Sequence, residues 1–389
     1  MKNCLSNKIL TIAIAACLVA CAFLFAGCGS SGSGYSTNIS KELTHESSAE
    51  ITHATGFSID YYKDGYKLIT IDEEGQFLIV PEGKEAPSDL SSEIVVIKQP
   101  VQNIYLVATA TMDMFRSIDA LDSIKMTGTK ASDWYIPEAV ERMEGGQIVY
   151  AGKYSMPDYE VILSNNCDLA IESGMIYHTP DVKEALEARG IPVMVDLSSY
   201  EGEPLGRVEW VKVYGAITNH EDEANAAFEQ QRQLFAEATS GEKLASTPTV
   251  AFFYITTSGA VSVRVGDDYI PKMIELAGGK YVYSDLVNEN SNASSKTLQM
   301  ENFYEKAKNA DVLIYNSTID STMNSIDDMI GKSEFLANFD AVKAGHVWIT
   351  SQNMYQDSME FGYFIVDVKK ILQNPEVSDD ELVYLRRMV

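Results

Sequence analysis

The clearest pattern in the chain is the alternation of apolar and polar residues in "FSIDYYKDGYKLITIDEEGQFLIVPEG", residues 57–83. It forms three short runs separated by turn residues at 63–65 and 72–75. Period-two alternation interrupted by such turns is typical of antiparallel strands, so this segment is predicted to be a small β-meander. Residues 35–55 are polar and Ser-rich without periodicity, and we expect them to be disordered or loosely attached.

From Gln102 onward, short apolar runs alternate with amphipathic stretches of helical period. The apolar runs predict buried strands and the amphipathic stretches predict helices. The predicted strands are "NIYLVAT", "IKMTGT", "CDLAIES" and "IPVMVD", and the helices between them are "TMDMFRSIDAL", "IPEAVERM" and "DVKEALEARG". Alternating strands and helices predict βα units around a parallel sheet.

A helical connector follows and a second alternating region comes after it. Gly206 to Ile217 is predicted to be helical, and Glu221 to Thr239 is predicted to be one long helix with acids in its first turn and Gly241 beyond its end. Strands at "TVAFFYI", "KYVYS", "DVLIYN" and "HVWIT" then alternate with further helices. The fold class is therefore α/β: two α/β lobes with mainly parallel sheets, joined by a long rigid helix, with a ligand cleft between the lobes.

The first residues have the pattern of an export signal. Lys2 and Lys8 precede Ile9 to Ala26, an apolar run without a charge; a short membrane-spanning helix is the alternative. Phe25-Ala26-Gly27-Cys28 resembles the lipobox of bacterial lipoproteins, in which the cysteine is lipidated and becomes the new N-terminus. Phe25 stands where Leu is usual. We expect a protein that is extracytoplasmic and lipid-anchored at the cell membrane through Cys28.

These patterns divide the chain into five parts. They are a lipoprotein signal peptide, the lipidated cysteine with a flexible tether, the β-meander with an N-terminal lobe, a helical connector that includes the interlobe helix, and a C-terminal lobe. The corresponding ranges are 1–27, 28–55, 56–205, 206–241 and 242–389.

Charge excludes one class of partner. The chain has 30 Lys and Arg against 56 Asp and Glu, a net charge of −26, and cleavage before Cys28 would remove two of the basic residues. Such a surface repels phosphate backbones, so no nucleic acid is expected as a partner. It is also repelled by anionic lipid, which makes a covalent anchor necessary. Because Cys167 is the one cysteine outside the signal region, no internal disulfide is possible.

Candidate ligand-binding residues come from the carboxyl ends of the predicted strands, where loops converge in open parallel sheets. Any one aromatic residue there could equally cap the core, but the group together favours binding. The candidates are Trp134, Tyr135, Met175, Tyr177, His178, Arg264, Trp348 and Tyr355. Arg264, after the first strand of the second lobe, is expected to hold an anionic ligand against the general negative charge.

Motifs of catalysis and metal binding are absent from the sequence. The five histidines are scattered, and there is no HExxH, Cys-x-x-Cys, G-x-S-x-G, P-loop or dinucleotide fingerprint after the first strand of either lobe. We therefore expect no catalytic residues, no bound metal and no cofactor. The sequence favours a protein that holds a ligand over an enzyme.

Several segments in order carry a family resemblance. They are "YKDGYKLITIDEEGQFLIVPEG", "MPDYEVILSNNCDLAIES", "PLGRVEWVKVYGAITNHEDEA", "YIPKMIELAGGKYVYSDL" and "FYEKAKNADVLIYNST". With the lipobox, they resemble the substrate-binding lipoproteins of ABC importers for iron complexes and cobalamin, from about Phe57 to the C-terminus. The resemblance implies a ligand between two lobes, small closure, and an ABC permease with its ATPase as partners of a monomer.

The resemblance also implies two carboxylates that dock onto permease arginines, which by motif position are Glu160 and Glu301. Both could instead be ordinary first-turn acids of helices. A ferric siderophore is the expected ligand, with haem and cobalamin as alternatives. A surface sensor that reuses the fold without transport, and a lipid-anchored enzyme, are the remaining readings.

Overall fold

The computed structural model describes residues 35–241, 244–287 and 293–389. Thr37–Val389 form one compact unit, and every element named below lies in it. The expected signal peptide, Cys28 and the start of the tether lie outside the described residues. No helix within the described ranges is both long enough and apolar enough to cross a membrane.

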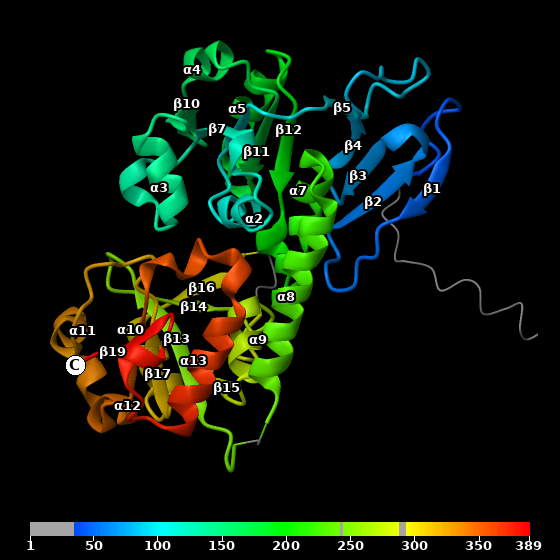
Figure 1. Cartoon of the computed structure of the whole chain (residues 1–389). Coiled ribbons are helices and arrows are strands. Elements are labelled where there is room, and N and C mark those ends of the chain that lie inside the picture. The colour runs from blue at the N-terminus through cyan, green and yellow to red at the C-terminus, as the bar shows by residue number, and fades with distance from the viewer. Residues whose placement is uncertain (1–34, 242–243, 288–292) are drawn as a thin grey trace, which may run out of the picture. The chain divides into compact units, whose positions relative to one another are not determined.

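The predicted meander is the centre of a five-stranded sheet (Figure 1). In spatial order the strands are β1 (His45–Ser48), β2 (Phe57–Tyr62), β3 (Lys67–Ile71), β4 (Gly75–Val80) and β5 (Val95–Lys98). Neighbouring strands are antiparallel, except that β4 and β5 are parallel. One face of the sheet packs into the main core, and Lys67 at the start of β3 donates to the Ala216 carbonyl and the Asn219 side chain.

The expectation that residues up to 55 form a loose tether is wrong for the described part. Strand β1 pairs with β2, and residues 52–56 are held by two buried carboxylates. Glu209 accepts the backbone N–H groups of Thr52, His53 and Ala54 at 2.7–3.0 Å. Glu201 accepts those of Thr55 and Gly56. These contacts join residues about 150 positions apart in the chain, so no local pattern reveals them.

The first lobe has a parallel sheet in the order β12 (Val193–Asp196), β11 (Leu169–Ser173), β6 (Ile104–Leu106), β7 (Ile124–Thr127) and β8 (Val149–Tyr150). The chain runs outward from β6 to β8 and then from β11 to β12, so the strand order switches between β6 and β11. The helices are α2 (Thr111–Ser117), α3 (Pro137–Glu144), α4 (Tyr159–Ser164) and α5 (Pro180–Glu187). A switch point is where open α/β sheets form a crevice.

The helical connector matches its prediction closely. It consists of α6 (Pro204–Glu209), α7 (Val211–Thr218) and α8 (Glu221–Thr239), which has the predicted bounds. Asn219, with φ of 60°, ends α7 in the left-handed conformation that short polar side chains tolerate. Helix α8 contacts α7 and also α13 of the second lobe (Gly362–Gln373), so it connects the two lobes (Figure 1).

The second lobe has a mixed sheet rather than a mainly parallel one. Its order is β16 (Ser295–Leu298), β14 (Val261–Arg264), β13 (Thr249–Ile255), β17 (Val312–Tyr315), β18 (Val347–Thr350) and β19 (Leu385–Arg387), and β15 (Lys280–Tyr281) also pairs with β13. The parallel strands are the predicted ones, whereas β14, β16 and β19 are antiparallel additions. The helices are α9 (Tyr269–Leu276), α10 (Met300–Ala307), α11 (Ile326–Lys332), α12 (Asp340–Ala344) and α13.

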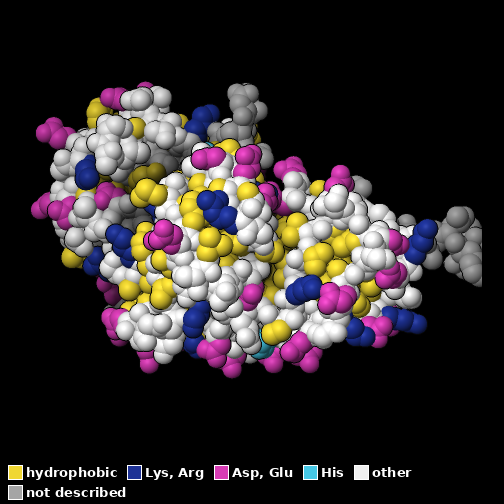
Figure 2. All heavy atoms as spheres, turned by 90° about the horizontal axis from the view of Figure 1, so that it is seen from above, with side chains coloured by type: hydrophobic (Ala, Val, Ile, Leu, Met, Phe, Trp, Pro, Cys, Tyr) yellow, Lys and Arg dark blue, Asp and Glu magenta, His cyan; other side chains and the backbone are white. Residues whose placement is uncertain are grey.

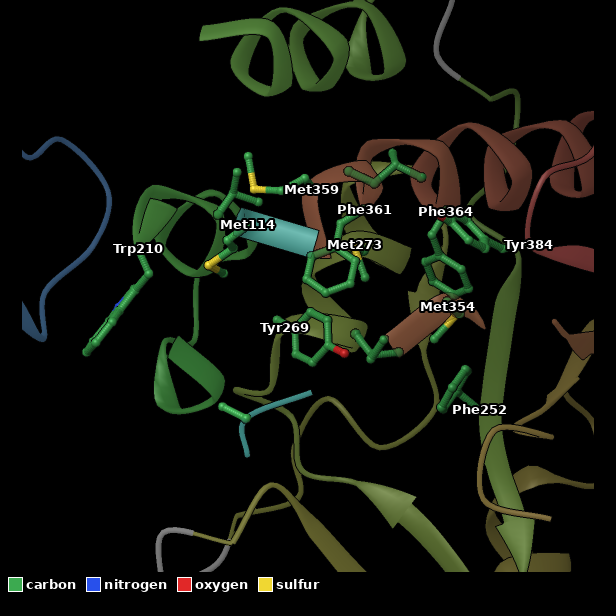
Figure 3. Packing of buried hydrophobic residues seen from close by; sticks show 14 of the residues in the cluster. Met114, Trp210, Phe252, Tyr269, Met273, Met354, Met359, Phe361, Phe364 and Tyr384 are labelled. Carbon is green, nitrogen blue, oxygen red and sulfur yellow. The ribbon is translucent and has the colours of Figure 1, made fainter. Parts of the chain in front are cut away.

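One hydrophobic cluster extends through both lobes and the connector. Figure 3 shows Met114 of the first lobe, Trp210 of the connector, and Tyr269 and Phe361 of the second lobe in this cluster. Tight packing resists shear because interiors are nearly as dense as organic crystals. The continuous cluster therefore favours a nearly rigid relation between the lobes.

Candidate ligand-binding cleft

Two cavities meet beside the loop that follows strand β12. The first, about 530 Å³, is here called the turn cavity because the β3–β4 turn forms one side of it; it is lined by Thr55, Gly56, Asp72, Glu73, Tyr177, Leu197, Tyr200 and Glu201. The second, about 470 Å³, is called the interlobe cavity; it is lined by Ser199, Tyr200, Glu201, Gly202, Val265, Asp267, Asp268, Lys272, Ala293 and Ser294. Tyr200 and Glu201 line both cavities, so the two are adjacent.

The wall from the first lobe is formed where the carboxyl ends of β11 and β12 lie. Strand β11 runs into a short 3-10 helix, Gly174–His178, on which Met175, Tyr177 and His178 are exposed. The Tyr177 hydroxyl donates to Glu74 Oε1 at 2.5 Å, and Lys183 pairs with the other oxygen of Glu74 at 2.9 Å. Burial and the hydrogen bond to Glu74 raise the pKa of Tyr177, so its hydroxyl stays protonated at neutral pH. The predicted residue Tyr177 thus lines the turn cavity.

Tyr200 is the cavity residue that the sequence interpretation missed. It ends the 3-10 helix Ser198–Tyr200 directly after β12 and is half exposed. A Cβ on Gly174 would lie only 2.5 Å from the Tyr200 hydroxyl, so a larger residue at position 174 would displace the Tyr200 side chain from its present position. The rule that ligands bind at the carboxyl ends of strands would have identified Tyr200, had it also been applied to β12.

The structure brings Arg264 and Tyr355 of the second lobe together beside the interlobe cavity, although neither residue lines it. Arg264 at the end of β14 donates to the Tyr355 hydroxyl at 2.5 Å, and Asn316, directly after β17, donates to the same oxygen at 3.0 Å. Arg264 also contacts Asp268 at 3.5 Å and Ser294 at 3.0 Å. The guanidinium is therefore already hydrogen-bonded and paired with a carboxylate, which weakens the expectation that it binds an anion.

Other contacts join the two lobes beside the cleft. The Tyr135 backbone N–H donates to Gln356 Oε1 at 2.8 Å, and its hydroxyl donates to Gln352. Arg116 of α2 contacts Asp113 at 2.6 Å and Glu360 of the second lobe at 3.5 Å. The backbone N–H and the hydroxyl of Tyr135 are thus both hydrogen-bonded to the second lobe, and its role in ligand binding stays a prediction.

Two predicted site residues lie in the core instead. Trp348 is fully buried on β18, between β17 and the edge strand β19, and the Arg387 guanidinium carbon lies 5.2 Å from the centre of its ring. Trp134 is 4% exposed and belongs to the main hydrophobic cluster. The indole N–H groups of both lack a hydrogen-bond partner among the described residues. The expectation that Trp348 borders the cleft is wrong because its side chain is buried in the main hydrophobic cluster. Trp134 is buried in the same cluster, so little of its ring is exposed to a ligand.

The two expected docking glutamates are exposed on separate lobes. Glu160 is in the first turn of α4, whose N-cap Asp158 accepts the backbone N–H groups of Glu160 and Val161. Glu301 is in the first turn of α10. Neither carboxylate forms an ion pair with another described residue. Their positions fit docking and fit helix-end acids equally well.

Carboxylates dominate the electrostatics of the cleft. Asp72, Glu73, Glu201, Asp267 and Asp268 line the two cavities, and Lys272 is the one cation among the described lining residues. On the face seen in Figure 2, Lys and Arg side chains lie singly among Asp and Glu. No group of three or more His, Cys, Asp or Glu side chains within the described ranges is placed to hold a metal ion.

Comparison with known proteins identifies the family. The periplasmic binding protein family matches residues 107–354, so the chain belongs to this family. It is therefore a solute-binding protein by class, with two α/β lobes as predicted.

Two curated relatives are named as lipoproteins. One uncharacterized lipoprotein of Methanocaldococcus jannaschii is 28% identical over 331 residues, covering 81% of this chain and 77% of the relative. A second from the same organism is 26% identical over 383 residues, covering 92% of this chain and 94% of the relative.

Solved structures share the fold at low identity. The periplasmic haem-binding protein of Vibrio cholerae has a TM-score of 0.55 at 16% identity, covering 70% of this chain and 98% of that chain. An ABC-type Fe³⁺-hydroxamate transport protein of Saccharomonospora viridis has a TM-score of 0.54 at 18% identity, covering 72% of this chain and 94% of that chain. The molybdate-binding protein of Haemophilus influenzae has a TM-score of 0.55 at 14% identity, covering 72% of this chain and 88% of that chain.

Proposed function

We propose that this protein is an extracytoplasmic, lipid-anchored binding protein that captures an iron complex and delivers it to an ABC permease. The observation that carries the proposal is the pair of adjacent cavities at the carboxyl ends of β11 and β12 in a member of the periplasmic binding protein family. Cavities of several hundred cubic ångströms suit small-molecule ligands. A ferric siderophore remains the favoured ligand, with haem and cobalamin as the alternatives.

Two features support an iron complex. Structures of the same fold include proteins named for haem and for Fe³⁺-hydroxamate transport. The turn cavity combines the aromatic residues Tyr177 and Tyr200 with carboxylates, which suits a bulky organic chelate better than a bare ion. The ligand would lie against Tyr177 and Tyr200, with Met175 and His178 at the margin and the Arg264–Tyr355 pair on the facing lobe.

The anchor is proposed at Cys28. Two acyl chains give stable membrane attachment where one gives only marginal binding. The lipoprotein relatives support this proposal. Mass spectrometry of the mature N-terminus should find an acylated Cys28, whereas an intact N-terminal Met1 would favour the transmembrane alternative.

Delivery to a permease is tested through the docking carboxylates. We expect the double charge reversal Glu160→Lys/Glu301→Lys to abolish uptake of radioactive iron chelate in cells that carry the cognate permease, with the chelate Kd unchanged. The reason is that each lysine would face a permease arginine, and like charges at an interface cost several kcal/mol. Glu141→Lys/Glu305→Lys, which reverses exposed helical acids on the same two lobes, is the matched control. Normal uptake by the double variant would show that Glu160 and Glu301 are helix-end acids and no more.

A further inference from the structure

The turn cavity has one wall that lies outside the family match. The match begins at residue 107, whereas Asp72 and Glu73 belong to the turn between β3 and β4 of the N-terminal sheet. Strand β3 brings this turn to the loops after β11 and β12, and the neighbouring Glu74 fixes it there through Tyr177 and Lys183. The N-terminal sheet therefore contributes to the cavity as well as covering the connector.

The carboxylates of this turn differ from the other acids of the cavity. Glu201 already accepts N–H groups from Thr55, Gly56 and the Trp210 indole. In contrast, neither Asp72 nor Glu73 accepts a side-chain hydrogen bond or forms an ion pair with another described residue. Burial, Glu73 and Glu201 together raise the pKa of Asp72. Two uncompensated carboxylates thus border a cavity that contains no Lys or Arg among its described lining residues.

The aromatic residues of the cavity suit the same kind of ligand group. Tyr177 and Tyr200 are each about half exposed. Tyrosine faces attract cations because the ring quadrupole is negative above its plane. The basic side chains nearest the cleft are already paired: Lys183 with Glu74, Lys272 with Glu203, and Arg264 with Asp268. Among the described residues that line the two cavities, the single Lys or Arg is therefore Lys272, which is already paired.

From this arrangement we infer that the turn cavity receives a positively charged, amine-bearing group of the ligand, so that cationic iron chelates bind in preference to anionic ones. The inference rests on the proposed iron-complex function and names the charge class of the ligand. It replaces the expectation of an anionic complex held by Arg264. The bound amine would lie against Tyr177 and Tyr200 and neutralise Asp72 and Glu73.

The test uses one chelate in three charge forms. A ferric trihydroxamate with a free terminal amine is compared with its N-acetylated and N-succinylated derivatives, which carry the same iron centre but a neutral or an anionic end. The full-length protein in detergent is titrated at low ionic strength, where screening is weak. We expect the amine form to bind about tenfold more tightly than the succinylated form, since one cation–π contact with nearby carboxylates contributes about 1 to 2 kcal/mol.

A matched pair of variants locates the preference. Asp72→Asn/Glu73→Gln should bring the amine-to-succinyl affinity ratio close to one, with the affinity for the acetylated chelate unchanged. The control variant Asp64→Asn/Glu82→Gln removes the same two negative charges, but from turns at the opposite end of the same sheet. It should keep the amine-to-succinyl affinity ratio of the native protein. Thermal unfolding of each variant confirms that it is folded.

The outcomes separate the two proposals. Equal or tighter binding of the succinylated chelate, or a ratio that survives the Asp72→Asn/Glu73→Gln change, would overturn the charge inference alone. Failure of all three chelates to bind would overturn the ferric-siderophore assignment and this inference with it.

Discussion

Replacing Glu172 by methionine is expected to raise the free energy of unfolding at pH 8 and above by roughly 4 to 5 kcal/mol. Glu172 lies at the end of strand β11, is fully buried, and neither carboxylate oxygen has a hydrogen-bond partner among the described residues. On the same sheet face, Ala170 and Val195 belong to an apolar cluster. Burial raises the pKa of Glu172 to about 8.

The sign of the pH dependence follows from proton uptake on folding. Between the ordinary glutamate pKa of 4.5 and the folded value of about 8, the folded state holds a proton that the unfolded state has lost. The stability of the native protein should therefore fall as pH rises through this window. The Glu172→Met variant lacks this loss, so its advantage should grow from pH 4.5 to pH 8 and then remain constant.

Urea unfolding at a series of pH values measures this effect. Glu187→Met, at the exposed end of α5, is the control and should leave the shape of the pH profile unchanged. Parallel profiles for the native protein and Glu172→Met would contradict the assignment of a buried, uncompensated carboxyl.

The second large effect is expected at Glu209, where alanine should lower the free energy of unfolding by about 3 to 5 kcal/mol. Glu209 is fully buried, accepts three backbone N–H groups of residues 52–54, and pairs with Lys212 at 2.7 Å. Its removal leaves these partly buried N–H donors without their acceptor and takes the carboxylate from the Lys212 ammonium, which keeps only the Glu50 carbonyl. Glu209→Gln keeps the shape and one acceptor oxygen, so it should be less damaging.

The acid limb of the stability curve gives an independent check on Glu209. Burial alone would raise its pKa, but hydrogen bonds from Lys212 and the backbone outweigh burial, and the pKa is lowered. The carboxylate therefore contributes stability above about pH 4.5 that is lost as pH falls through the folded value. The Glu209→Gln variant should lose this contribution, whereas Glu223→Gln, at an exposed first-turn acid of α8, should leave the acid limb unchanged.

A decrease in the free energy of unfolding of less than about 1 kcal/mol for Glu209→Ala would show that other contacts hold residues 52–56.

Periodicity in the sequence predicts the regular elements well. The bounds of α8, the meander strands β2 to β4 and four strands of the first lobe, β6, β7, β11 and β12, follow from apolar spacing, whereas the two-residue strand β8 does not. The sequence does not predict that residues 45–56 form an ordered segment, because the Glu201 and Glu209 carboxylates that bind residues 52–56 come from a distant part of the chain. Strands β16 and β19 are not predicted because their residues, SKTL and LRR, are mostly polar and form no apolar run. Strand β14 is a four-residue strand that pairs with β13 across a short turn.

The site was predictable only in part, for a related reason. The rule about strand ends directs attention to Tyr177, which lines the turn cavity, and to Arg264 and Tyr355, which contact each other but line neither cavity. Their roles in ligand binding stay predictions. The rule cannot tell which side of the sheet a strand residue faces, and so Trp348 was placed wrongly. Nor can it indicate that a turn of a separate sheet, carrying Asp72 and Glu73, completes the cavity.

The central claim is that the cleft binds an iron complex, and direct titration of the full-length protein tests it. Ferric trihydroxamates, haemin and cobalamin are each added while visible absorption and heat are recorded, because each ligand has its own spectrum. The account predicts saturable one-to-one binding of a ferric chelate, with no covalent change to ligand or protein. A perturbed porphyrin band without chelate binding would move the assignment to haem, and no binding of any of the three ligands would contradict the account.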